Sequence, residues 1–133
     1  MTRVTLDTNE LISAFNFRGK ALELIHRAIN GEVEIAISEA ILVETMRVLR
    51  DKFEWNPYEL RALNDWLIKI CKLVEPKHTL VAVADDPDNR ILECSEEAGS
   101  EFIITEDRAL LRVKEHAGAK LVRAADFLAG RQR

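Results

Sequence analysis

Short apolar stretches typical of β-strands alternate along this chain with longer stretches of helical periodicity, and this alternation constrains the fold more than any other feature. Parallel strands can be joined only through a crossover, usually a helix, so the pattern predicts an α/β fold: a mainly parallel sheet of four to five strands with helices on both faces. Strands are predicted at residues 4–7, 33–37, 102–105 and 119–122, with a further short strand or extended segment at 80–84. Helices are predicted at residues 8–15, 21–29, 39–52, 57–74, 88–98, 107–115 and 124–128.

Composition favours one globular domain over residues 1–133. With 47% apolar and 32% charged residues, the chain can bury a core beneath a charged surface. No apolar run approaches the roughly 20 residues needed to cross a bilayer, and the N-terminus begins with a strand pattern instead of a signal peptide. Cys71 and Cys94 are isolated on predicted helices, which indicates buried reduced thiols. We therefore expect a cytoplasmic protein that does not contact a membrane.

The net charge of −4 does not identify a partner by itself. An acidic balance argues against a nucleic-acid ligand, but a bound divalent cation would reverse the sign of an acidic site locally. Basic residues also form short clusters, among them Arg47, Arg50 and Lys52. A solvated helix face is the simpler interpretation of any one such cluster, so charge leaves the choice of partner open.

Two carboxylates follow predicted strands. Asp7 ends the first strand, and Asp107 follows the strand at 102–105 after one intervening residue. In open α/β sheets the carboxyl ends of the strands line the ligand crevice, so these two side chains can meet although they are far apart in sequence. The simpler alternatives are that Asp7 is a loop acid and that Asp107 is the N-cap of the next helix.

Asp88 lies on the apolar stripe of its predicted helix, because Ile91 and Leu92 follow it by three and four residues. A capping role at the helix N-terminus is the alternative, yet Asp86, which precedes the proline expected at the first helical position, is the better candidate cap.

Glu44 lies at the edge of the apolar face of its helix. Its position is equally consistent with a metal ligand and with a boundary residue that pairs with Arg47 or Arg50.

A cluster of carboxylates indicates a divalent metal. Gathered acids raise one another's pKa unless a cation neutralises them, and Mg²⁺ or Mn²⁺ is the cation that an all-oxygen site selects. Such a site suits phosphodiester hydrolysis. The three histidines are not paired at ligand spacing, and no serine-nucleophile or glycine-rich phosphate motif is present. The chemistry, if any, is therefore expected from the carboxylates.

Four motifs in order resemble those of PIN domains. They are Val4-Thr5-Leu6-Asp7-Thr8-Asn9-Glu10-Leu11-Ile12-Ser13-Ala14, Ser38-Glu39-Ala40-Ile41-Leu42-Val43-Glu44, Asp86-Pro87-Asp88-Asn89-Arg90-Ile91-Leu92-Glu93-Cys94 and Phe102-Ile103-Ile104-Thr105-Glu106-Asp107-Arg108-Ala109-Leu110-Leu111. The resemblance implies a three-layer αβα sandwich and a metal-dependent nuclease site. The residues that match the acidic quartet of the family are Asp7, Glu44, Asp88 and Asp107. Asn9 and Thr105 match polar positions around it.

The branch that this chain is most similar to is described as toxins of toxin–antitoxin pairs, relatives of the VapC ribonucleases. That resemblance implies an endoribonuclease acting on single-stranded or structured RNA, an antitoxin protein as partner, and a homodimer. The alternative is a catalytically weak or inactive PIN-like module that binds RNA or a protein partner.

Two positions depart from the family pattern. The spacing around Pro87 is one residue shorter than is common, which leaves open whether Asp86 or Asp88 faces the metal. Glu106 replaces a glycine that is common before the last Asp, and it is either a fifth ligand or a residue that crowds the site.

Overall fold

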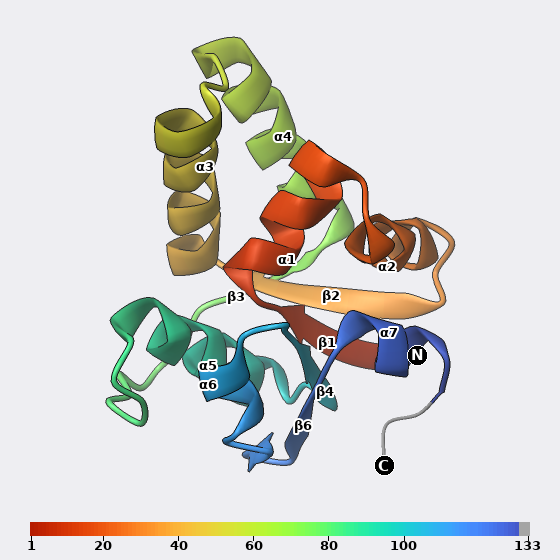
Figure 1. Cartoon of the computed structure of the whole chain (residues 1–133), viewed down its shortest axis with the longest axis vertical. Coiled ribbons are helices and arrows are strands. Elements are labelled where there is room, and N and C mark those ends of the chain that lie inside the picture. Colours follow the sequence, from red (N-terminus) through yellow and green to blue (C-terminus); the bar gives the residue numbers. More distant parts are fainter. Residues whose placement is uncertain (131–133) are drawn as a thin grey trace.

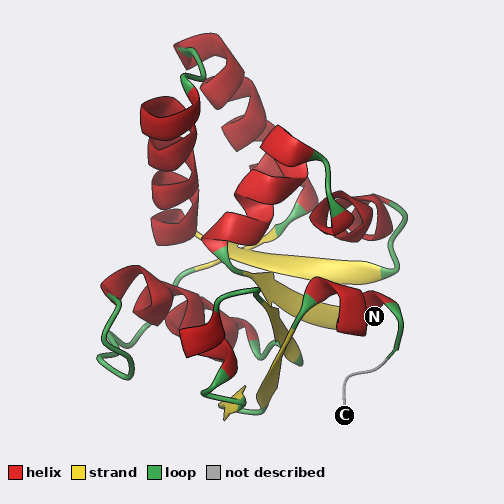
Figure 2. Cartoon of the chain, viewed as in Figure 1, coloured by secondary structure: helices red, strands yellow, loops and turns green. Residues whose placement is uncertain are grey.

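The computed structural model describes residues 1–130 and shows a six-stranded sheet between two layers of helices (Figures 1 and 2). The strands are β1 (Thr2–Leu6), β2 (Val33–Ser38), β3 (Lys72–Val74), β4 (Phe102–Ile104), β5 (Glu115–His116) and β6 (Ala119–Val122). Their order in the sheet is β3-β2-β1-β4-β6-β5. All neighbours pair in parallel except β5 and β6, which form an antiparallel hairpin. The predicted α/β class with a mainly parallel sheet is therefore confirmed.

The helices lie on both faces of the sheet. They are α1 (Thr8–Ile12), continued by the π-helix η1 (Ser13–Phe17), α2 (Lys20–Ile29), α3 (Glu39–Phe53), α4 (Pro57–Ile70), α5 (Asp86–Ala98), α6 (Arg108–Leu111) and α7 (Ala124–Leu128). Figure 1 shows α1 to α4 on one side of the sheet and α5 with α6 on the other, while α7 packs near α2. No helix within residues 1–130 is long and apolar enough to cross a membrane.

The predicted number of strands was too low, because two strands overlap predicted helices. Helix α4 ends at Ile70, and Cys71 is extended with φ −98° and ψ 161°. Lys72–Val74 then pairs with Ala36–Ser38 of β2, so Cys71 is not on a helix as predicted. Pairing with a strand more than thirty residues away outweighed the local helical pattern.

The second missed strand, β5, begins at the last residue of the predicted helix 107–115. Helix α6 stops at Leu111, and Lys114 takes a left-handed φ of 67°. Gly118, with φ 87°, then turns the chain into the antiparallel pair with β6.

The segment at 80–84 is not a strand but a loop that bends at residues 83–84. The side chain of Asn89 holds it in place: its Oδ1 accepts the backbone N–H of Ala82 at 2.9 Å and of Val83 at 3.0 Å, and its Nδ2 donates to the Val83 carbonyl at 3.0 Å. These bonds replace the sheet partners that the segment lacks.

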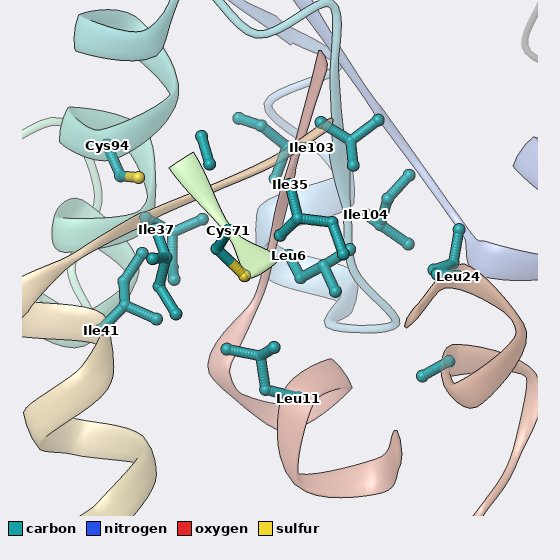
Figure 3. Packing of buried hydrophobic residues seen from close by; sticks show 14 of the residues in the cluster. Leu6, Leu11, Leu24, Ile35, Ile37, Ile41, Cys71, Cys94, Ile103 and Ile104 are labelled. Carbon is teal, nitrogen blue, oxygen red and sulfur yellow. The ribbon is translucent and has the colours of Figure 1, made fainter. Parts of the chain in front are cut away.

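Apolar side chains from both faces of the sheet form one core (Figure 3). Leu6, Ile35 and Ile103 from three neighbouring strands are each 1% exposed or less. Both cysteines are free and lie within this core, and burial raises the pKa of each thiol to about 12. The core thus holds the central strands rigidly, and with them the residues that follow their carboxyl ends.

Candidate acidic site

The carboxyl ends of β1 and β4 bring two acids together in the middle of the sheet. The chain runs outward from β1 to β2 and β3 and then returns to place β4 on the other side of β1. The gap between β1 and β4 is therefore the point where the strand order reverses, which is where ligands bind in open α/β sheets. Asp7 follows β1, and its backbone N–H donates to the Ile104 carbonyl at 3.0 Å. Asp107 follows β4 by three residues.

A polar pocket of about 240 Å³ opens at this point. All four acids of the predicted quartet line it: Asp7, Glu44, Asp88 and Asp107. The other lining residues are Thr8, Asn9, Arg47, Val48, Lys52, Asp85 and Pro87. A larger cavity of about 500 Å³ lies beside β3 and contains none of the quartet.

Asp7 is the most deeply placed of the four carboxylates, with 5% of its surface exposed. Burial raises its pKa above the ordinary value, and the negative charge of Asp107 raises it further. The hydroxyl of Thr105, which donates to Asp7 Oδ2 at 2.7 Å, and nearby backbone N–H groups oppose this rise in pKa. A cation beside Asp7 would relieve the same cost.

Thr105 joins two of the acids. Its hydroxyl donates to Asp7 and accepts the backbone N–H of Asp107 at 3.0 Å. Asp107 in turn is the N-cap of α6, since its Oδ1 accepts the N–H groups of Ala109 at 2.7 Å and Leu110 at 3.1 Å. The capping role foreseen as the alternative for Asp107 is thus present. It engages one carboxylate oxygen, and the other makes no hydrogen bond within the described residues.

Asp88 lies in the first turn of α5 and is 8% exposed. Burial raises its pKa to about 7, and the charges of Asp85, Asp7 and Asp107 add to the effect on this pKa. The charge of Asp107 thus raises the pKa of both Asp7 and Asp88, and the charge of Asp7 raises that of Asp88, which places the three carboxylates within electrostatic reach.

The expected cap of α5 was wrong by one residue. Asp85 is the N-cap and accepts the Asp88 N–H at 3.3 Å, while Asp86 is the first helical residue and Pro87 the second. The side chain of Asp86 is 73% exposed and pairs with Arg90 at 3.1 Å. It lines a neighbouring cavity of about 220 Å³ instead of the acidic pocket.

Glu44 reaches the pocket from α3, and its carboxylate is occupied. Arg47 donates to both of its oxygens, from Nη2 at 2.6 Å and from Nε at 3.3 Å. The pairing foreseen as the alternative for Glu44 is therefore present, although the residue also lines the pocket. Asn9 is exposed at the pocket rim.

Glu106 points away from the pocket. Its Oε2 accepts the Ala124 N–H at 3.1 Å, and Arg123 lies 3.8 Å from its Oε1. It faces Glu10 of α1, which is 5% exposed, and burial together with the charge of Glu106 raises the Glu10 pKa to about 8.

Six pocket residues were not predicted as site residues. Thr8 and Pro87 are neighbours of predicted ones, and the other four are Asp85, Lys52, Arg47 and Val48. Asp85 was missed because Pro87 was expected at the first position of α5 and occupies the second. The other three recur on α3 around Glu44 at helical spacing, which could have identified them once Glu44 was placed in the site.

The donor set fits a hard divalent cation. The possible oxygen ligands that line the pocket are carboxylates and the Asn9 amide, which suit Mg²⁺ and Mn²⁺, and a cation would remove the cost of repulsion among the carboxylates. Within residues 1–130 no three His, Cys, Asp or Glu side chains are arranged to hold an ion by themselves. Mg²⁺ commonly takes only one or two carboxylates and completes its shell with water and substrate phosphate, so this arrangement remains compatible with it.

The raised pKa values predict how stability depends on pH in the absence of metal. Asp88 and Glu10 have pKa values of about 7 and about 8 in the folded chain, against ordinary values of 3.8 and 4.5. Between the ordinary and the raised pKa of each group, the folded state therefore binds more protons than the unfolded state. The free energy of unfolding falls as the pH rises through this range.

We expect the melting temperature in chelator to drop by a few degrees between about pH 5 and about pH 8. Added Mg²⁺ should reduce the drop, because it favours the charged carboxylates. Thermal unfolding across this range measures the effect, and a melting temperature that rises with pH would contradict it.

The chain belongs to the PIN domain family, because the model of that domain matches residues 3–109. This confirms the resemblance found in the motifs. No curated protein sequence matches the chain.

Solved structures share the fold. VapBC-1 from nontypeable Haemophilus influenzae has a TM-score of 0.65 at 13% identity, over 93% of this chain and 99% of that one. The DNA-bound VapBC from Salmonella typhimurium has a TM-score of 0.65 at 14% identity, over 93% and 99%. VapBC2 from Rickettsia felis, bound to a fragment of its promoter DNA, has a TM-score of 0.62 at 15% identity, over 92% and 98%.

Proposed function

We propose that this protein is a divalent-metal-dependent endoribonuclease that hydrolyses RNA phosphodiester bonds in the cytoplasm, and a toxin controlled by a cognate antitoxin. The observation that carries the proposal is the burial of Asp7 beside Asp88 and Asp107 in one polar pocket at the strand-order reversal. A stable fold gains nothing from acids that raise one another's pKa, and a cation site requires them.

The four acids have different roles in this proposal. Asp7 and Asp88 hold the ion most directly, because both are buried and face the same pocket. Asp107 would use the oxygen that does not cap α6, and Glu44 would bind an ion in competition with Arg47. Thr105 orients Asp7, and Asn9 supplies an amide at the rim.

When bound, Mg²⁺ or Mn²⁺ lowers the pKa of a coordinated water and neutralises charge on the phosphate. The chain's part is to keep the carboxylates ionised and fixed in direction. Asp86 and Glu106 have no ligand role, because one pairs with Arg90 at the surface and the other faces Glu10.

The proposed antitoxin partner is supported by three structures that share the fold and are named as VapBC assemblies, two of them with DNA. A homodimer of this chain is part of the proposal on the resemblance to the toxin branch alone.

A cleavage assay on mixed RNA tests the proposal. We expect cleavage with Mg²⁺ or Mn²⁺ and a loss of at least about a hundredfold in excess chelator, restored by returning the metal. Product gels with parallel metal and chelator arms measure this result. A purified, folded protein that cleaves no RNA with any divalent metal would instead identify the alternative, an inactive PIN-like module that binds RNA or a protein.

A further inference from the structure

One wall of the acidic pocket is basic. Glu44, Val48 and Lys52 recur every four residues on α3, so they share one face of the helix, and all three line the pocket. Arg47 lines it as well. Arg47 and Lys52 of α3 therefore line the same space as the carboxylates that follow β1 and β4.

Arg50, the other cation in this part of α3, lies outside the acidic pocket. It pairs with Asp51 at 2.7 Å. Lys52 forms no ion pair within residues 1–130, so its ammonium group is available to an anion in the pocket. Of the basic cluster noted in the sequence, Arg47 and Lys52 therefore line the pocket and Arg50 does not.

Arg47 holds the Glu44 carboxylate in a geometry that would also suit a phosphate. Its guanidinium forms a two-point contact with Glu44 through Nη2 and Nε, and its side chain is 50% exposed. The planar guanidinium fork matches phosphate oxygens as well as carboxylate oxygens. A cation coordinated by Glu44 would compete with Arg47 for the same two carboxylate oxygens and repel its charge, so binding of an ion would favour release of the fork at the edge of the pocket.

We propose that Arg47 and Lys52 bind the RNA phosphate at this site, and that Arg47 exchanges Glu44 for the phosphate when a divalent ion takes Glu44. The inference rests on the proposed ribonuclease function. It makes the Glu44–Arg47 pair a link between metal binding and RNA binding, in which each ligand favours the other.

This link predicts that a single variant, Arg47→Gln, binds metal more tightly and RNA more weakly. In Arg47→Gln, Glu44 is already free, so Mn²⁺ should bind about two- to fivefold more tightly without RNA, which is the scale of one exposed ion pair. The same variant should bind single-stranded RNA about three- to tenfold more weakly in Ca²⁺, because a phosphate contact is lost. Arg47→Lys, which keeps the charge and lacks the fork, should lie between the wild type and Arg47→Gln in both measurements.

Lys52→Gln should weaken RNA binding without the gain in metal affinity that follows the loss of the Glu44 pair. The slope of log K against log salt should become shallower by about 0.7 for the lost contact to a single strand. Arg50→Gln is the matched control, since it removes the same charge from the same helix outside the pocket. It should change both affinities much less than Arg47→Gln.

The measurements are Mn²⁺ binding by the loss of the free-ion electron paramagnetic resonance signal, and binding of a short labelled RNA by fluorescence anisotropy. Gels confirm that the RNA stays intact, and circular dichroism confirms that each variant is folded. If Arg47→Gln and Lys52→Gln match Arg50→Gln while the wild type cleaves RNA with metal, the inference is overturned and the proposed function stands. If the wild type cleaves no RNA with any metal, the proposed function fails first.

Discussion

Asp7→Asn is expected to lower RNA cleavage by at least about a hundredfold while the protein stays folded. The substitution removes the charge that faces the pocket from the end of β1. An asparagine carbonyl can still accept the Thr105 hydroxyl, which now donates to Asp7 Oδ2 at 2.7 Å. Burial and Asp107 raise the pKa of Asp7, so a neutral residue at this position removes a cost. The melting temperature in chelator should therefore be unchanged or a few degrees higher.

A matched control is Asp65→Asn, which makes the same chemical change on the exposed surface of α4. It should leave both cleavage and melting temperature close to the wild type. Metal-dependent cleavage by Asp7→Asn at the wild-type rate would show that Asp7 does not serve the reaction. A large fall in melting temperature would show that its charge is structural.

Asp88→Asn should reduce cleavage by about a hundredfold, whereas Asp86→Asn should reduce it by no more than about twofold. The contrast follows from where the two side chains point. Asp88 is 8% exposed and lines the acidic pocket, where its pKa is raised to about 7 by burial and by three other acids. Asp86 is 73% exposed and pairs with Arg90 four residues later.

The two variants differ by two positions in one helical turn and make the same change in charge, so each is the control for the other. Mn²⁺ affinity gives a second readout, which should weaken in Asp88→Asn and stay constant in Asp86→Asn. The opposite order of effects would place Asp86 at the metal and would mean that α5 begins with a different rotation about its axis.

Local sequence patterns predicted most elements and failed in two places for different reasons. The helix expected through residue 74 had a continuous local pattern, yet Lys72–Val74 pairs with β2, a partner that is absent from the local window of sequence. The hairpin at Gly118 is local, since Glu115 pairs with Lys120 and His116 with Ala119. It was missed because a strand only two residues long has no pattern of its own.

For the candidate site, the sequence located the acids but not the directions of their side chains. The residue types and the order of the motifs located the four acids, and all four line one pocket. The directions of their side chains could not be predicted, because each depends on partners from other elements. Arg47 pairs with Glu44, the N-terminus of α6 uses one oxygen of Asp107, and the Ala124 N–H binds Glu106.

The sequence alone determined the fold class, the family and the set of acids, because hydrophobic periodicity and motif order are properties of the chain itself. Only the tertiary structure decided that Asp85 caps α5, that Asp88 and not Asp86 lines the pocket, and that Arg47 and Lys52 of α3 line it together with the acids. These features arise from the rotation of each helix against the sheet. That rotation is set by packing of the whole core, where a shift of one residue turns a side chain by about 100°.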